Sequence, residues 1–257
     1  MSGSASEARI ALACLDLTSL NDGDDAAAIE ALCAQAIGPT GRGWPAAVCV
    51  WPRFVAQARA ALPAAIRVAA VANFPAGALD LNLALRDTAA ILDAGGDEVD
   101  LVLPWRSMQA GDHAGATALV AAVRSASAGK TLKLIIESGE LLPAEIATAC
   151  AIGLNAGVDF LKTSTGKTAH GAGVVAAGQM LARIAGHSRR AEVGFKASGG
   201  VRRVADASVY IALLRQALGD SAVDPSRMRF GASGLLADVE ALLGFGATAA
   251  NSSDARY

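Results

Sequence analysis

Short apolar runs recur along the chain and alternate with longer alanine-rich segments whose apolar positions repeat every three to four residues. The short runs are typical of buried strands in a parallel sheet, and the longer segments are typical of helices packed on such a sheet. Eight strands are predicted, over 14–18, 47–51, 66–73, 98–104, 131–137, 159–164, 192–197 and 228–232. The predicted helices include 24–37, 80–94, 115–127, 143–156, 174–185 and 205–218.

Repeated strand–helix units without a long linker predict an α/β fold, a closed TIM (β/α)8 barrel, with a doubly wound open sheet as the alternative. The length of 257 residues fits one barrel domain. Residues 1–257 are therefore interpreted as a single domain. Within it, the small and polar segment 244–257 is expected to form a flexible C-terminal tail.

Composition and charge argue against several classes of partner. The formal net charge is −2, and the basic residues are scattered, so no nucleic-acid partner is expected. No apolar stretch reaches about 18 residues, which predicts no membrane span. The four cysteines form no CxxC pair, and the N-terminus has no signal-peptide layout, so a cytoplasmic protein with reduced thiols is expected. The three histidines are dispersed, and no metal site is predicted.

Two lysines lie within predicted strands, Lys162 and Lys196. Burial disfavours an ammonium ion, and a second ammonium nearby depresses the pKa of whichever lysine is better buried. A free amine is the nucleophile that forms a Schiff base with a carbonyl compound. The alternatives are that Lys162 extends to a surface ion pair and that Lys196 forms an ordinary ion pair with Asp16 or Asp100.

Polar residues also occur where the predicted strands end, and the carboxyl ends of barrel strands surround the active site in this fold. Besides the two lysines, they are Asp16, Cys49, Asn73, Asp100 and Glu137. Asp100 interrupts an apolar run, and a buried carboxylate needs a partner. It is interpreted either as a structural partner of a lysine or as a functional group beside the amines, and the two interpretations are compatible.

Glycine-containing turns follow the last three predicted strands, over 163–167, 198–202 and 231–234. Such turns expose backbone N–H groups to an anion, and barrels commonly bind phosphate after strands seven and eight. Lys167 and Arg202 would add positive charge. A phosphate site is therefore predicted.

These residues lie in segments that resemble the 2-deoxyribose-5-phosphate aldolase family, in order and over nearly the whole chain. The most specific segment is Phe160-Leu-Lys-Thr-Ser-Thr-Gly-Lys167. The other segments are 15–20, 48–54, 73–75, 97–100, 194–196, 199–202, 229–233 and the terminal Tyr257. The chain departs from the family at Ser198 and Gly234, which puts phosphate affinity rather than reaction type in doubt.

The resemblance implies a class I aldolase that needs neither metal nor other cofactor and cleaves 2-deoxyribose 5-phosphate to glyceraldehyde 3-phosphate and acetaldehyde. Lys162 would form the Schiff base, Lys196 would lower its pKa, and Asp100 would transfer a proton through water. The resemblance also implies a proton-transfer role for Tyr257, a position for Asp16 near Lys196 and a position for Cys49 close to the pocket. The implied phosphate contacts are Thr165, Lys167, Gly199, Gly200, Val201, Arg202, Gly231 and Ser233.

The expected partners are small phosphosugars and aldehydes, and the assembly considered is a homodimer. Two other functions stay open at this point. One is a Schiff-base aldolase or transaldolase that acts on another phosphosugar, because pocket shape decides the substrate. The other is a non-catalytic protein that binds a sugar phosphate.

Overall fold

The computed structural model describes residues 2–246 and contains a closed barrel of eight parallel strands in sequence order. The strands are β1 (Leu15–Thr18), β2 (Ala47–Val50), β3 (Arg67–Ala72), β4 (Glu98–Val102), β5 (Thr131–Ile135), β6 (Phe160–Lys162), β7 (Gly194–Ser198) and β8 (Met228–Ala232). Pairing of β1 with β8 closes the sheet. The predicted TIM barrel is therefore confirmed, and the alternative of an open sheet is wrong.

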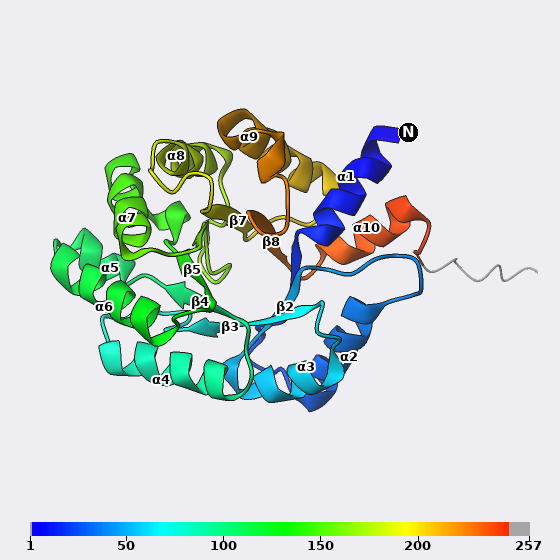
Figure 1. The fold of residues 1–257 in the computed structure, drawn as a ribbon, viewed down its shortest axis with the longest axis horizontal. Coiled ribbons are helices and arrows are strands. Elements are labelled where there is room, and N and C mark those ends of the chain that lie inside the picture. The colour runs from blue at the N-terminus through cyan, green and yellow to red at the C-terminus, as the bar shows by residue number, and fades with distance from the viewer. Residues whose placement is uncertain (1, 247–257) are drawn as a thin grey trace, which may run out of the picture.

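Helices surround the barrel on its outer side (Figure 1). They are α1 (Ser2–Ala13), α2 (Ala26–Ile37), α3 (Val55–Ala61), α4 (Leu81–Asp93), α5 (Trp105–Gln109), α6 (His113–Ala126), α7 (Pro143–Ala156), α8 (Val174–Ala185), α9 (Val204–Leu218) and α10 (Leu235–Leu243). Three short 3-10 helices lie at Pro52–Phe54, Ser138–Glu140 and Asp220–Ala222. Within residues 2–246, no helix is long and apolar enough to cross a membrane.

Local sequence explains where several helices begin and end. The side chains of Asp25, Asp80 and Asp112 accept hydrogen bonds from backbone N–H groups in the first turns of α2, α4 and α6. Gly157 ends α7 in the left-handed conformation that glycine adopts readily. Gly244 ends α10 in the same way, so the expected tail begins with a helix cap. Most of that tail, 247–257, lies outside the described residues.

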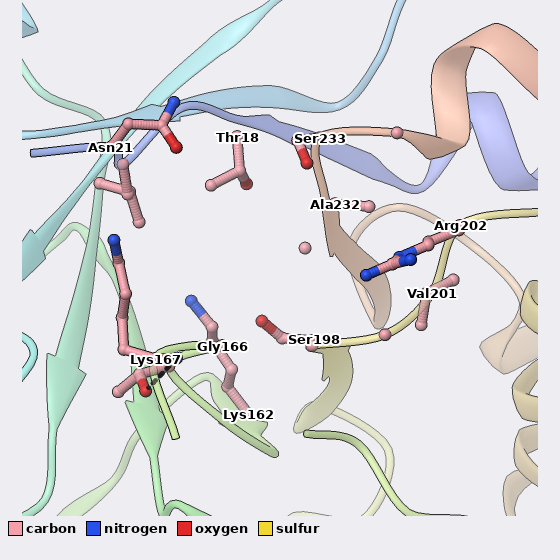
Figure 2. A pocket seen from close by; sticks show the side chains of 16 residues that line it. Thr18, Asn21, Lys162, Gly166, Lys167, Ser198, Val201, Arg202, Ala232 and Ser233 are labelled. Carbon is pink, nitrogen blue, oxygen red and sulfur yellow. Dashed lines mark hydrogen bonds between the residues drawn. The ribbon is translucent and has the colours of Figure 1, made fainter. Parts of the chain in front are cut away.

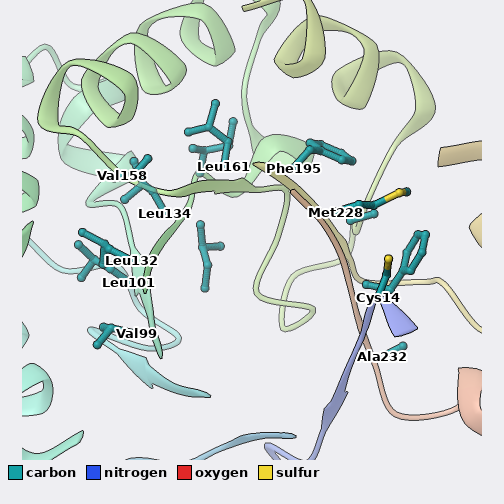
Figure 3. Packing of buried hydrophobic residues seen from close by; sticks show 14 of the residues in the cluster. Cys14, Val99, Leu101, Leu132, Leu134, Val158, Leu161, Phe195, Met228 and Ala232 are labelled. Carbon is teal, nitrogen blue, oxygen red and sulfur yellow. The ribbon is translucent and has the colours of Figure 1, made fainter. Parts of the chain in front are cut away.

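Alternation along the strands sends apolar side chains outward and charged side chains inward. Val99, Leu132 and Phe195 belong to the large apolar core between barrel and helices, and they are fully buried (Figure 3). Their neighbours Asp100, Lys133 and Lys196 are fully buried as well, on the other face of the sheet. The register places Asp100 beside Lys133 and Lys162 beside Lys196. This interior therefore contains charge on strands where barrels usually place branched apolar residues.

The interior is not charged throughout. Leu20, Cys49, Ala69 and Val71 form a small apolar cluster on the side of β2 and β3. Charged side chains are thus confined to the side formed by β4 through β8 and β1. The carboxyl ends of β6, β7 and β8 on this side border a cavity (Figure 2).

Candidate active site

Seven buried ionisable side chains meet inside the barrel and form what we call the ion cluster. It contains three carboxylates and four cationic groups: Asp16, Glu98, Asp100, Lys133, Lys162, Lys196 and Arg229. Bringing charges out of water is costly unless each one is paired. The pairing pattern therefore determines which member is able to lose its charge.

Asp100 is the shared partner of three lysines. Its Oδ2 accepts hydrogen bonds from Lys162 Nζ and Lys196 Nζ, each at 2.7 Å. Lys133 Nζ lies 3.0 Å from the other carboxylate oxygen, Oδ1. Because three lysine side chains share this one carboxylate, it stabilises the charged form of each lysine less than an unshared partner would.

The other two carboxylates stabilise every cation except Lys162. Asp16 Oδ2 lies 2.5 Å from Lys196 Nζ and 2.7 Å from Lys133 Nζ, and Asp16 Oδ1 lies 2.6 Å from Arg229. Glu98 lies 2.6 Å from Lys133 and 2.9 Å from Arg229. Within residues 2–246, Lys162 pairs with Asp100 and with no other carboxylate.

This difference separates the pKa values of the two strand lysines. Burial lowers the pKa of Lys162, and the pull of Asp100 is countered by the Lys196 ammonium, so the pKa lies below its usual value. Burial also acts on Lys196, but Asp100 and Asp16 outweigh it and raise the pKa of Lys196. The prediction that the better-buried lysine has the depressed pKa is wrong. Lys196 is the better buried of the two, and the number of carboxylate partners decides the direction.

Charge counting agrees with this assignment. Three other members of the cluster stay charged although they are buried. Ion pairs hold the pKa of the Asp16 and Asp100 carboxyls low and the pKa of Lys133 high. When Lys162 is neutral, three cations balance three carboxylates in the ion cluster. The cluster is therefore suited to hold one unprotonated amine at Lys162.

The cavity above the ion cluster is about 270 Å³ in volume. Lys162, Lys167 and Arg202 line it, and among the described residues no carboxylate does. Figure 2 shows Lys162 and Ser198 pointing into the cavity, with Arg202 reaching in from the opposite side. Within residues 2–246, Arg202 has no ion-pair partner, so its guanidinium is free to bind an anion.

The alternative that Lys162 extends to a surface ion pair is wrong, because its side chain is only 3% exposed and pairs with Asp100.

The rim of the cavity includes all eight of the residues predicted to contact phosphate. They are Thr165, Lys167, Gly199, Gly200, Val201, Arg202, Gly231 and Ser233. Gly199 and Gly200 both have positive φ values, which favours glycine. A Cβ on Gly231 would lie 2.8 Å from Ser198 Oγ, so this position needs glycine as well. Ser233 and Gly234 place the N-terminus of α10 at the rim, where helix N–H groups favour an anion.

Among the described residues, several other predicted site residues do not line this cavity, Asp100 and Lys196 included. Cys49 was predicted to lie close to the pocket. It is fully buried, with Sγ 4.0 Å from Asp100 Oδ2, and does not line the cavity. Asp16 is also fully buried, and its ion pairs within residues 2–246 are all with members of the ion cluster. Asn73 donates hydrogen bonds to the carbonyls of Ala78 and Val102 and so stabilises loop structure. Tyr257 lies outside the described residues.

Three members of the ion cluster were not among the predicted site residues: Glu98, Lys133 and Arg229. Strand alternation contained the signal for two of them. Lys133 lies between Leu132 and Leu134, and Glu98 lies two residues before Asp100 on the same face. Within residues 2–246, no group of three or more His, Cys, Asp or Glu side chains is placed to hold a metal ion.

Comparison with known proteins identifies the family. The model of the DeoC/LacD family aldolases matches residues 10–240. The chain belongs to this aldolase family. A deoxyribose-phosphate aldolase from Agrobacterium fabrum is 44% identical over 236 residues, which is 90% of each chain. The prediction of an aldolase is therefore confirmed, and a non-catalytic sugar-phosphate binding protein is excluded.

Solved structures agree with the barrel fold of this aldolase. A proposed deoxyribose-phosphate aldolase from Coccidioides immitis is 27% identical, with a TM-score of 0.78, over 89% of this chain and 85% of its own. Another from Toxoplasma gondii ME49 is 24% identical, with a TM-score of 0.85, over 95% of this chain and 98% of its own. The second similarity supports the fold alone.

Replacing Lys196 by methionine removes the ammonium that opposes protonation of Lys162 and leaves Asp100 freer to pair with it. We expect the pKa of Lys162 to rise, so the fraction of neutral amine at pH 7 falls. The pH at which Lys162 traps acetaldehyde at half its maximal rate, with borohydride as reductant, should increase by about one pH unit or more. Lys130→Met, an exposed lysine, is the matched control and should leave the profile unchanged. An unshifted profile in a folded Lys196→Met protein would contradict this assignment.

Proposed function

We propose that this aldolase reversibly cleaves 2-deoxy-D-ribose 5-phosphate to D-glyceraldehyde 3-phosphate and acetaldehyde through a Schiff base on Lys162. The observation that carries the proposal is a buried lysine of lowered pKa at the floor of a cavity whose rim presents Lys167, Arg202 and glycine turns. The relative from Agrobacterium fabrum carries the name of the same activity. A small sugar that bears an aldehyde at one end and phosphate at the other fits both features.

The first half of the cycle forms the covalent intermediate. Lys162 Nζ attacks C1 of the open-chain aldehyde, and loss of water gives an iminium ion. This step places a positive charge where Lys162 was neutral, 2.7 Å from Asp100 Oδ2. The carboxylate would therefore stabilise the iminium, and the protonated Lys196, which contacts the same carboxylate oxygen, would donate the proton that the leaving hydroxyl needs to depart as water.

The second half breaks the carbon–carbon bond. A water held by Asp100 removes the proton of the C3 hydroxyl, the C2–C3 electron pair moves toward the iminium, and glyceraldehyde 3-phosphate leaves. An enamine remains on Lys162. Protonation of its terminal carbon and addition of water then release acetaldehyde and regenerate the amine. The phosphate group stays at the rim, where Arg202 and Lys167 bind it.

The cellular setting is part of the same proposal. The four cysteines are free and buried, which fits a cytoplasmic enzyme. Cleavage of a deoxyribose phosphate would serve carbohydrate degradation. A homodimer is proposed as the assembly, without a nucleic-acid partner.

Trapping with borohydride tests the covalent step. Incubation with deoxyribose 5-phosphate or acetaldehyde should leave a reduced adduct on Lys162, and an ethyl group in the case of acetaldehyde, detected by peptide mass. Lys162→Ala should abolish the adduct and the cleavage activity, whereas Lys130→Ala should retain both. Asp100→Asn should lower kcat by about 10²-fold or more, because a general acid–base group is lost. An adduct that persists in Lys162→Ala would reject the mechanism, and an adduct with other phosphosugars alone would favour a different aldolase or transaldolase.

The role proposed for the terminal tyrosine is protonation of the enamine carbon. Tyr257→Phe should slow turnover and the exchange of acetaldehyde methyl protons with deuterated water by about tenfold or more, while KM changes little. The measurement is steady-state cleavage together with exchange followed by NMR. Unchanged exchange in the variant would remove Tyr257 from the mechanism.

A further inference from the structure

The segment 163–173, which we call the β6–α8 loop, begins directly after Lys162 and includes Thr165, Gly166 and Lys167 at the cavity rim. An eleven-residue segment without helix or strand needs contacts that fix it. The position of this loop matters because it connects Lys162 directly to three residues of the cavity rim.

Glu137 fixes this loop from the neighbouring strand end. Its side chain is fully buried, and its carboxylate accepts hydrogen bonds from the Thr165 hydroxyl at 2.6 Å and the Thr165 N–H at 3.1 Å. The Thr168 hydroxyl lies at 3.5 Å. No cation pairs with Glu137 in the described part of the chain, so neutral donors alone compensate for burial of this charge.

The backbone of Glu137 shows that this orientation is imposed. Its φ value is 55°, in the left-handed region that non-glycine residues rarely adopt. Such a conformation persists only where the surroundings enforce it, and it is common at functional sites. The residue is not part of the ion cluster, and the proposed reaction does not use it.

Glu137 also decides which donors of the loop remain free. Both donors of Thr165 point to Glu137, and the Lys167 N–H donates to Thr165 Oγ1 at 3.0 Å. Among the three residues at the rim, the Gly166 N–H is the one without an acceptor in the described structure. Gly166 and Lys167 both line the cavity, and Lys167 Nζ lies 3.8 Å from the exposed Asp22 carboxylate.

The far end of the loop is attached to the other half of the rim. The Ala172 N–H donates to the Gly199 carbonyl at 2.9 Å, and Tyr210 Oη donates to the Ala172 carbonyl at 2.9 Å. A Cβ on Gly199 would lie 2.9 Å from Gly171 Cα, so the two backbones are in close contact. Displacement of the loop would therefore disturb the glycine turn after β7 as well.

We propose that Glu137 is a positioning residue for phosphate binding: it holds the β6–α8 loop so that Gly166 and Lys167 face the phosphate, and Thr165 acts through this contact rather than as a direct ligand. The inference rests on the proposed function, since it concerns the phosphate end of the substrate. It separates the phosphate side of the site from the amine side, which the ion cluster controls.

The test compares a phosphorylated and a phosphate-free reactant. Glu137→Gln keeps the shape but places an NH2 group against the Thr165 donors. It should raise KM for deoxyribose 5-phosphate and the inhibition constant of inorganic phosphate by about tenfold to hundredfold. Borohydride trapping of acetaldehyde on Lys162 should keep its rate and pH profile. Glu192→Gln, an exposed carboxylate paired with Arg189, is the matched control.

A second variant keeps the test decisive if Glu137→Gln does not fold. Thr165→Val removes the hydroxyl donor and should produce the same two increases with normal acetaldehyde trapping. The double variant should be no worse than either single one, because both break the same contact. Additive losses would assign Thr165 as a direct ligand and overturn the inference, as would unchanged constants in both single variants. A wild-type enzyme that neither cleaves deoxyribose 5-phosphate nor is inhibited by phosphate would instead refute the proposed function.

Discussion

Asp100 is shared by three lysine side chains, and the chemistry proposed for the barrel depends on that sharing. Its contacts with Lys133, Lys162 and Lys196 are all at 3.0 Å or less. Lys133 and Lys196 also contact Asp16 or Glu98, and these carboxylates favour their protonated forms. Lys162 has no such second carboxylate within residues 2–246. A buried ion network adds little to stability compared with an apolar core. Here it maintains one amine in a reactive state.

Two different parts of the fold form the site: strand residues inside the barrel and loops at its rim. The ion cluster, built from strand residues on β1 and β4 through β8, controls the amine. Glycine turns, the N-terminus of α10 and the loop held by Glu137 form the rim. In the proposed mechanism, strands thus carry the reacting amine, while loops would recognise the phosphate end. This arrangement is common among barrels, whose loops vary while the strands stay fixed.

Much of this arrangement could be predicted from the sequence. Alternating apolar runs predicted all eight strands, and helix periodicity predicted α2, α4, α6, α7, α8 and α9. Four helices were not among those predicted. α3 and α5 have only seven and five residues, too short for a clear helical repeat, and α1 and α10 do not lie between two of the predicted strands. α1 and α10 pack side by side across the β1–β8 closure (Figure 1). The lysine pair and Asp100 were recognisable because charge interrupts an apolar strand. The partners of each lysine were not, because contacts between strands far apart in sequence decide which amine is depressed. Strand position also did not give the depth of Cys49 in the barrel, where it lies beside Asp100 and not at the cavity rim.

Direct titration of the lysines tests this account at its centre. NMR of protein labelled with 13C at lysine Cε, with the Lys162 signal assigned by its absence in Lys162→Ala, gives the pKa of the amine in the resting enzyme. We expect Lys162 to titrate clearly below the ordinary value of about 10.4, while Lys133 and Lys196 remain protonated above it. A Lys162 signal that titrates at or above that value, or a depressed Lys196 in its place, would contradict the account.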